Sequence, residues 1–247
     1  MKTTFFARMV LMTSDMQPNT GKTLLRTYHG VSYSRLPIKT QTIMPKDNLE
    51  KIVSEAVLPR KQDGDVLCIS EKIVAITQGR AYHIDDIHPS WFAKLLSKYV
   101  YKSDAGIGIG SPWTMELAIR EAGYIRIFFA AAVSAVTTPF GVRGLFYRVV
   151  GKHINAIDGP CDYTIPPFNK YAKLPPKEPH KAAKKLSALL GIPVVIIDAN
   201  DLGVNILGVS DGTIDQVMIC ELFRDNPLGQ KSESTPLCIV RKYEPAN

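Results

Sequence analysis

The sequence contains no apolar run long enough to cross a lipid bilayer, which argues against a single membrane-spanning helix. Its first residues, MKTTFFARMVLM, have the basic start and apolar segment of a signal peptide. However, Arg8 interrupts that segment, and no pair of small residues spaced for cleavage follows it. We therefore expect a cytoplasmic protein with no membrane partner, in which residues 1–35 form an N-terminal extension or a first strand.

Cysteine is scarce as well, with four in 247 residues. No two of them have the spacing of a zinc knuckle or a redox pair, so neither kind of site is predicted. Cys68, Cys220 and Cys238 lie in apolar segments and should be small core side chains. Cys161 lies in the polar run IDGPCDY, but no adjacent base is apparent, so a plain loop thiol is favoured over a nucleophile.

Signatures of nucleotide and nucleic-acid binding are missing too. The run Asn19–Thr23 resembles the end of a phosphate-binding loop, but Met16 occupies the position of the required first glycine. Nor is any nucleic-acid-binding module recognisable, although the formal charge is +7 and the isoelectric point about 9.2. As explanations of this charge we rank a solvated helix face first, an anionic ligand second and nucleic acid third.

The sequence does contain short apolar runs that alternate irregularly with amphipathic segments, in an ordinary globular composition of 45% hydrophobic and 21% charged residues. Strands are predicted at 66–69, 124–130, 146–150, 194–197 and 237–240, with 36–43 extended. Helices are predicted at 48–57, from 89 onward, and at 114–122, 179–190 and 215–223. This pattern predicts an α/β or α+β fold with a mixed sheet. We expect residues 36–247 to form one catalytic unit, which could comprise two subdomains.

Capping residues place several helix ends. Asp47 and Glu50 have the spacing of a capping box at the start of the first helix. Ser111 followed by Pro112 is typical of an N-cap and a first helical residue. Gly191 is expected to end the helix that precedes the strand at 194–197.

That strand leads into the most informative stretch of the chain, IPVVIIDANDLGVNILG at 192–208. The apolar run ends at Asp198, which Asn200, Asp201 and Gly203 follow. An acidic residue where a buried strand meets a loop is well placed to hold a cation or a ligand, because a buried polar group needs a partner. The alternative is a polar Asx turn closed by Gly203.

Three loops rich in acids and amides each adjoin an apolar run. They contain Asn155 with Asp158, then Asp198 with Asn200 and Asp201, and finally Gln230 with Glu233. Oxygen ligands of this kind suit Mg²⁺ or Mn²⁺, whereas zinc prefers nitrogen and sulfur. Such metals commonly accompany nucleotide phosphates, whose transfer also needs basic side chains. The candidates for that role are Lys72, Arg80, Arg143 and Arg148. The alternative is three unrelated surface turns.

The order of several short motifs resembles the gamma-glutamyl ligase family that extends the deazaflavin coenzyme F-420. The similarity runs from about Leu36 to Lys242. The matching pieces are Asp63-Gly-Asp-Val-Leu with Ser70-x-Lys72 and Gly79-Arg80, Glu116-Leu-Ala-Ile-Arg-Glu121, Asn155-Ala-Ile-Asp158, Pro166-Pro167, Asp198-Ala-Asn200, and Gly229-Gln230 with Glu233-Ser-Thr-Pro236. Each piece is short, and their shared order carries the resemblance.

The resemblance implies a mixed α/β fold in an intertwined homodimer, divalent metal, and GTP consumed to form an amide bond through an acyl phosphate. It matches Asp158 and Asp198 to metal-binding aspartates. Gln230 stands where the family usually has glutamate, and Glu233 where it has aspartate. The segment with Ser70 and Lys72 matches one that lines the nucleotide or substrate site.

The sequence also departs from the family pattern. After Asp-x-Asn the family has Gly-Arg, but Asp201-Leu202 occupies these positions here. The glycine within Asn-Ala-Gly-Ile-Asp is absent, and residues 137–147 have no counterpart that we can match. We therefore expect a relative that joins a different acid and amine, with F-420 itself not the favoured substrate.

The sequence thus predicts a metal- and nucleotide-dependent ligase that joins a small carboxylic acid to an amino acid, using GTP or ATP with Mg²⁺ or Mn²⁺. The expected catalytic residues are Asp198, Asp158 and Lys72; the nucleotide-binding residues are Ser70, Lys72, Arg143 and Asn200; the metal ligands are Asp158, Asp198, Gln230 and Glu233. Two alternatives stay open. One is a metal-dependent phosphate-ester hydrolase, and the other is a non-catalytic protein that binds nucleotide or nucleic acid.

Overall fold

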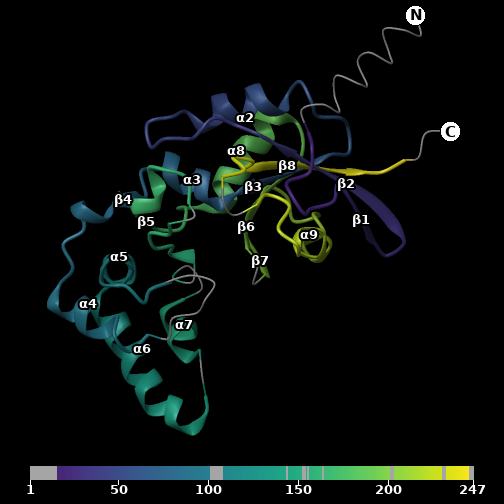
Figure 1. Cartoon of the computed structure of the whole chain (residues 1–247). Helices are drawn as coiled ribbons and strands as arrows, with labels where there is room; N and C mark the ends of the chain where they lie inside the picture. Colours follow the sequence, from purple (N-terminus) through teal and green to yellow (C-terminus); the bar gives the residue numbers. More distant parts are fainter. Residues whose placement is uncertain are drawn as a thin grey trace, which may run out of the picture. The chain divides into compact units, whose positions relative to one another are not determined.

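The computed structural model describes residues 16–100, 108–142, 144–151, 154, 156–162, 164–200, 203–229 and 232–244. The chain divides into two compact units. The first comprises Met1–Gln78 and Pro176–Asn247, and the second comprises Gly79–Pro175 (Figure 1).

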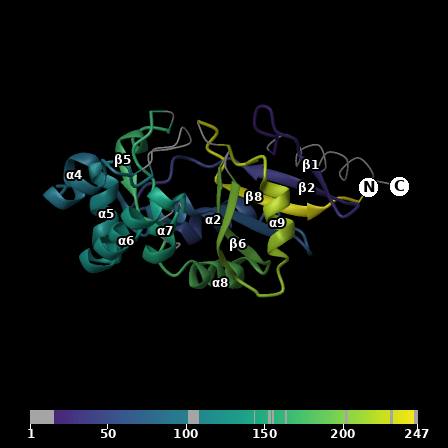
Figure 2. The same ribbon diagram turned by 90° about the horizontal axis from the view of Figure 1, so that it is seen from below.

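The first unit is built on a six-stranded mixed sheet with the order β1-β2-β8-β3-β6-β7. Its strands are β1 (Leu25–Tyr28), β2 (Val31–Ile38), β3 (Val66–Ser70), β6 (Val194–Asn200), β7 (Gly203–Val209) and β8 (Leu237–Lys242). Only the pair β3 and β6 is parallel; all other neighbours are antiparallel. Figure 2 shows β1, β2, β6 and β8 in a view from below. The predicted mixed sheet is confirmed, as are the strands at 66–69, 194–197 and 237–240.

Helices cover both faces of this sheet. Alternate strand residues point to opposite faces, so Leu67 and Ile69 join one core cluster while Cys68 joins the other. The first cluster packs against α2 (Leu49–Val57), α3 (Glu71–Thr77) and α8 (Pro179–Leu190). The second packs against α9 (Gln216–Phe223). Apolar strands buried on both faces explain why these runs were readily predicted from sequence.

The predicted capping box at Asp47 and Glu50 is wrong by one residue. Asn48 is the N-cap of α2, and its side chain accepts a hydrogen bond from the Lys51 amide at 3.0 Å. Asp47 instead accepts from the Met44 amide at 2.8 Å, within the preceding turn. Asparagine and aspartate cap helices about equally well, so local sequence could not separate the two.

Cysteine behaves largely as predicted. Cys68 and Cys238 are fully buried in the second cluster, whereas Cys220 and Cys161 are half-buried. Burial raises the pKa of the Cys238 thiol to about 12 and also raises the pKa of Cys68, so both thiols stay protonated.

In its described residues, the second unit contains a two-stranded sheet and four α-helices around its own core. Its elements are β4 (Ala81–His83), η1 (Ile84–Asp86), α4 (Trp91–Leu96), α5 (Pro112–Ala122), α6 (Tyr124–Thr137), η2 (Thr138–Phe140), α7 (Leu145–Val150), η4 (Phe168–Lys170) and β5 (Tyr171–Lys173). As predicted, Ser111 caps α5, and it does so in a capping box with Thr114. Gly123 then separates α5 from α6 in a conformation with φ +84° that favours glycine.

Two predicted strands of this unit are wrong. Residues 124–130 lie in helix α6, and residues 146–150 lie in helix α7. The aromatic and β-branched residues of YIRIFF favour a strand, but the alanine-rich continuation AAAVSAV favours a helix. No described helix is by itself long and apolar enough to cross a bilayer, although the bent pair Pro112–Ala122 and Tyr124–Phe140 meets that criterion jointly.

Candidate functional site

Three of the predicted site segments reach the same edge of the main sheet. Strands β3 and β6 run parallel and in register, with Ser70 opposite Ile197. Asp198 is therefore the first residue of β6 beyond this pair. Strand β8 runs the opposite way and begins with Leu237 opposite Ile69. The amide of Ser70 donates to the carbonyl of Pro236 at 2.8 Å, which brings the end of the loop that carries Glu233 beside Ser70.

Parallel strands place their carboxyl ends at one sheet edge, which is where open α/β proteins bind small ligands. Here that edge carries Ser70 and Asp198 from the parallel pair, and the chain entering β8 adds Glu233. All three side chains are half-buried, so they are partly desolvated while still accessible. The first unit thus presents polar residues from three separate segments of the chain at this edge.

Asp198 and Asn200 lie within β6 and not in a loop after it, which corrects the prediction that the strand ends at Asp198. Asp198 pairs with Asn205 and Asn200 with Gly203 across the β6–β7 hairpin. The Asn200 side chain accepts a hydrogen bond from the Gly203 amide at 3.2 Å. The alternative interpretation, a polar turn closed by Gly203, predicts a contact of this kind. Asn200 therefore has a structural role in the hairpin.

Gly229 lies directly against Glu233. Its φ of +77° is in the left-handed region, and a Cβ atom at this position would lie 2.6 Å from Cδ of Glu233. Only glycine therefore allows the Glu233 side chain to pack over this backbone. The residue after Glu233, Ser234, is also left-handed, with φ +56°. A non-glycine residue in this conformation is strained, and such strain is often found at functional sites.

Hydrogen bonds hold the loop between α9 and β8 in place. The Asn19 side chain donates to the carbonyl of Pro227 and to the hydroxyl of Thr235, both at 2.8 Å. Thr235 in turn donates to the carbonyl of Leu228 at 2.7 Å. The loop is thereby closed across its base, which restricts the backbone on both sides of Glu233.

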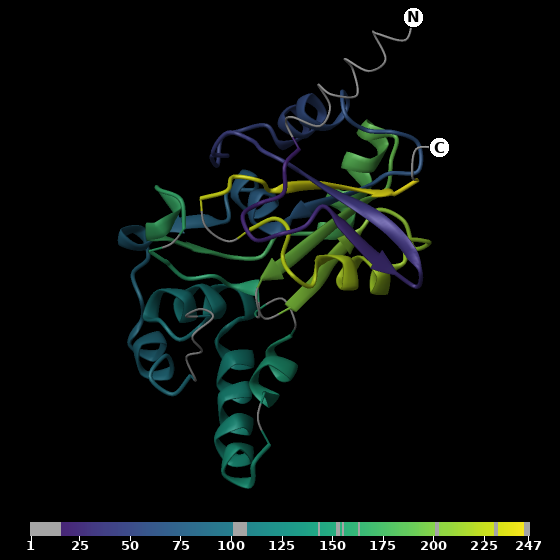
Figure 3. The ribbon, with the colours of Figure 1, turned by 45° about the vertical axis from the view of Figure 1, so that its right-hand side comes forward.

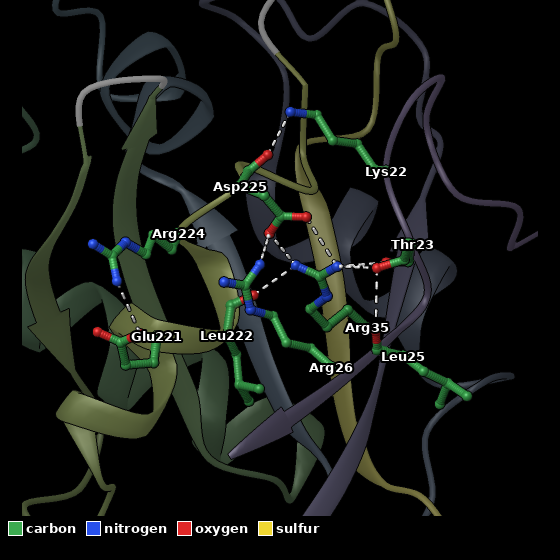
Figure 4. A network of polar contacts seen from close by, with 9 residues as sticks. All are labelled: Lys22, Thr23, Leu25, Arg26, Arg35, Glu221, Leu222, Arg224 and Asp225. Atoms are coloured by element: carbon green, nitrogen blue, oxygen red, sulfur yellow. Dashed lines mark hydrogen bonds and ion pairs between the residues drawn. The ribbon is translucent and has the colours of Figure 1, made fainter.

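A buried ion pair anchors the start of the same loop (Figure 4). Arg35 of β2 is fully buried, and its guanidinium binds both carboxylate oxygens of Asp225 and donates to the carbonyl of Leu222 at 2.7 Å. Arg26 adds a contact to Asp225 at 3.0 Å. Burial alone would raise the pKa of Asp225, but the hydrogen bonds and charge of Arg35 hold it below its ordinary value. Sequence analysis missed this pair, whose members are far apart in the chain.

Ser70 and Lys72 flank a buried acid at the start of α3. Ser70 is the N-cap residue of this helix, Glu71 is 2% exposed and Lys72 is half-buried. The short turn from β3 into α3 thus presents a hydroxyl and an ammonium group close together in sequence at the edge where β3 ends.

Asp158 belongs to the second unit, where it forms a bridge with β5. The backbones of Asp158 and Lys173 exchange hydrogen bonds of 3.1 and 2.8 Å. Nζ of Lys173 lies 3.5 Å from a carboxylate oxygen of Asp158 and 3.4 Å from the carbonyl of Ala156. The Lys173 side chain is 5% exposed and that of Asp158 is 51% exposed, so a buried cation orients an accessible carboxylate. Sequence analysis also missed Lys173; a lone lysine in an apolar run was its only signal.

Two further residues of the family motifs, Arg80 and Glu116, form hydrogen bonds and ion pairs within the second unit. The guanidinium of Arg80 is buried, donating to the Pro175 carbonyl at 2.5 Å and contacting Glu121 at 2.8 Å. Glu116 accepts from the amide of Ser90 at 2.9 Å and so caps α4. Burial would raise the pKa of Glu116, but this bond and Arg120 lower it overall. The suggested phosphate-binding role of Arg80 therefore has no support here.

Several predicted site residues lie outside the described residues, namely Arg143, Gln230, Asn155 and Asp201. Within the described part of the chain, no group of three or more His, Cys, Asp or Glu side chains is close enough to hold a metal ion. Strand topology therefore places Ser70, Asp198 and the chain that follows Glu233 at one edge of the main sheet, whereas Asp158 belongs to the second unit.

A mixed sheet that contains a parallel strand pair and is covered by helices on both faces defines the α/β class of fold. The chain belongs to the F420-0:gamma-glutamyl ligase family, whose model matches residues 37–209. It is therefore a member of a family of ligases. It is similar to the coenzyme F420:L-glutamate ligase of Methanopyrus kandleri, with 24% identity over 236 residues that cover 82% of this chain and 84% of that protein.

Proposed function

We propose that this protein joins the amino group of L-glutamate, or a related amino acid, to a small carboxylic acid at the expense of GTP or ATP. The family and the name of the M. kandleri relative support an amide-forming ligation of glutamate. We propose an acid other than F-420, because Asp201-Leu202 replaces the Gly-Arg with which the family follows its Asp-x-Asn.

The observation that supports this proposal is that the end of β3 with Ser70, the part of β6 with Asp198 and the chain entering β8 after Glu233 meet at one edge of the main sheet. Carboxylate oxygens at the edge of a sheet are ligand groups that suit a divalent cation. The adjacent Lys72 supplies the positive charge that a transferred phosphoryl group needs.

The donor set suits a divalent metal. Asp198 and Glu233 offer carboxylate oxygens, the ligands that Mg²⁺ and Mn²⁺ prefer. Asp158 from the second unit and the amide of Gln230 are proposed as further ligands. When bound, such an ion neutralises nucleotide phosphate charge. The buried Lys173 beside Asp158 would orient this carboxylate.

In the proposed reaction the acid's carboxylate attacks the terminal phosphoryl group of the nucleotide, which yields an acyl phosphate and the nucleoside diphosphate. The amine then attacks the acyl carbon and expels inorganic phosphate, leaving an amide and a proton. Lys72 and Arg143 are proposed to offset the charge of the phosphoryl group during transfer. The Ser70 hydroxyl is proposed to hydrogen-bond the nucleotide or the substrate.

The test is release of nucleoside diphosphate when the protein is mixed with GTP or ATP, Mg²⁺ or Mn²⁺, and a panel of acids and amino acids. The proposal expects release only when both an acid and an amine are present. Asp198→Asn and Glu233→Gln should each abolish it, whereas Glu55→Gln, whose side chain is 66% exposed on α2, should not. Failure of every pair to stimulate release would overturn the proposal, and release without an amine would indicate a hydrolase.

We also propose that the protein is a homodimer, as the family resemblance implies. Sedimentation equilibrium measures this directly, and a mass equal to that of one chain at all concentrations would refute it.

A further inference from the structure

The first unit has a groove between α2 and α8 that the proposed reaction does not use. The helices α2, α3 and α8 lie on one face of the main sheet (Figure 3). The groove is formed by residues from 46–50, from the second half of α3 with Gln78, and from 177–186. Its volume is about 500 Å³, which is in the range of small-molecule pockets. The described residues that line it include neither Ser70, Asp198 nor Glu233.

Four of the described residues that line this α2–α8 groove are exposed lysines. They are Lys46 before α2, Lys177 before α8, and Lys181 and Lys185 on α8. Lys181 and Lys185 are four residues apart, so their side chains project from the same face of the helix. Two distant segments of the chain thus place ammonium groups around one recess.

The three acids among these residues already have partners. The carboxylate of Glu50 lies 2.7 Å from Nζ of Lys185, and that of Glu178 lies 3.3 Å from Nζ of Lys181. The third acid, Asp47, accepts a backbone amide in the turn before α2. An ammonium group has three N–H donors, so a paired lysine can still donate to a bound anion. Lysine is in excess over acid, which favours an anionic ligand.

The buried part of the lining is apolar. Val74 of α3 and Leu186 of α8 are 1% and 2% exposed, and Leu49 and Ala182 pack against the same core cluster. Charges beside a low-dielectric wall are screened less than charges surrounded by water. The ammonium groups of the groove should therefore attract an anion more strongly than lysines on a convex surface.

Hydrogen bonds fix the backbone at the start of α8. The Gln78 side chain accepts from the amide of Lys177 at 2.7 Å and donates to the carbonyl of Lys177 at 3.0 Å. The next residue, Glu178, is left-handed with φ +44°, a conformation that is strained for a residue other than glycine. Because the backbone of Lys177 is held on both sides, its ordering on binding a ligand should cost less.

We propose that the α2–α8 groove binds a small anion with two or more negative charges, such as a polycarboxylate or a phosphate compound. Lys46 and Lys177 bind it together with the two lysines of α8. Several ammonium groups around one recess favour a multivalent anion over a monovalent one, because each charge of the ligand can meet a separate lysine. The proposal does not rest on the proposed ligase reaction.

The experiment is calorimetric titration of the full chain with citrate and, separately, with inorganic pyrophosphate, at constant ionic strength and with EDTA to remove divalent metal. We expect at least one of them to bind with a Kd of about 1 mM or tighter, and the tighter of the two shows whether carboxylate or phosphate is preferred. Lys72→Gln, at the candidate site, should leave this affinity unchanged. Binding of neither anion, or its loss in Lys72→Gln, would overturn the proposal.

The lysines are tested by Lys46→Gln and Lys177→Gln. Each should weaken anion binding about twofold to fivefold, the effect of one exposed ion pair. Lys242→Gln, at an exposed position at the end of β8, is the control for the loss of one positive charge. An equal effect of all three substitutions would mean general attraction by the net charge and would overturn the groove as the site.

An effect of opposite sign is expected for Glu50→Gln, which releases Lys185 from its ion pair. Anion binding should become about twofold to fivefold tighter. Glu55→Gln is the matched control, because Glu55 lies on the same helix and pairs with Lys51 at 4.0 Å outside the groove. Unchanged affinity in Glu50→Gln, or equal tightening in both variants, would contradict the proposal. None of these measurements depends on ligase activity.

Discussion

The positions of single residues at the candidate site depend on the packing and hydrogen bonds of their neighbours. Glu233 is usable only because Gly229 leaves room for it, and its loop is held by Asn19 and Asp225. Of these, the sequence predicted Glu233, because its motif resembles the family. It could not predict Arg35 or Lys173, whose partners are set by strand pairing and not by spacing.

Gly229→Ala tests the close packing against Glu233. The new methyl group would collide with the Glu233 side chain and also strain a left-handed backbone, so ligase activity should fall at least tenfold. The free energy of unfolding should fall by about 1 kcal/mol. Gly212→Ala, where no atom lies within 4 Å, is the control for loss of a glycine. Steady-state kinetics and urea unfolding measure both effects, and equal activity of the two variants would contradict the account.

Asp225 gives the first unit a pH-dependent stability. Its pKa is lower in the folded protein than in the unfolded chain, so its contribution is present above the unfolded value of about 4. That contribution is lost as pH falls through the folded pKa. In Arg35→Met this acid dependence should flatten, and the variant should be about 2–3 kcal/mol less stable near neutral pH. Urea unfolding of wild type and variant at several acidic pH values measures the free energy of unfolding. Parallel profiles of this free energy against pH would show that the Arg35–Asp225 pair does not cause the pH dependence.

At the scale of elements, sequence analysis succeeded where strands are buried on both faces and failed where composition is mixed. The core strands β3, β6 and β8 were predicted because uninterrupted apolar, β-branched runs are typical of strands that are buried on both faces. Residues 124–130 were assigned to a strand because a short window contains only their aromatic and β-branched start. The helix becomes clear only over the 14 residues of α6. The end of β6 was misplaced, because pairing with β7 carries Asp198 and Asn200 into the sheet.

The bridge between Asp158 and β5 gives an element-level prediction. Lys173→Met keeps much of the side-chain volume but removes the cation beside Asp158, so the carboxylate should lose its orientation. We expect ligase activity to fall about tenfold to a hundredfold, as for other residues that orient metal ligands. The apparent affinity for Mn²⁺ should fall with it, which a loss of stability alone would not produce. Lys170→Met, at an exposed position before β5, is the control. Unchanged metal dependence would count against a role for this pair.

Capping of α5 is a second test at this scale. Ser111→Ala removes the hydroxyl that accepts from the Thr114 amide, while the Ser111 amide can still donate to the Thr114 hydroxyl, and it should lower the free energy of unfolding by about 1 kcal/mol. Ser187→Ala, in the interior of α8, should have little effect. Thermal unfolding followed by circular dichroism compares the two, and equal melting temperatures would mean that the box contributes nothing.

For the whole molecule, the sequence established the family and the mixed α/β class, while the assembly of the candidate site required the strand order. Residues 70, 198 and 233 are far apart in the chain, and no spacing rule connects them. They reach one edge because β8, the last strand, inserts between β2 and β3, and because β3 pairs with β6. This topology fixes which loops can share a ligand, and side-chain identity then decides which ligand it is.

The central claim is that Asp198 and Glu233 bind the metal-nucleotide complex together. Calorimetric titration of Mn²⁺ with GTP, and separately with ATP, into wild type, Asp198→Asn, Glu233→Gln and the control Glu55→Gln tests it most directly. The account predicts that at least one nucleotide binds, that each site variant weakens this binding about tenfold or more, and that the control leaves it unchanged. Equal affinity in all four folded proteins, or dependence on only one of the two carboxylates, would contradict it.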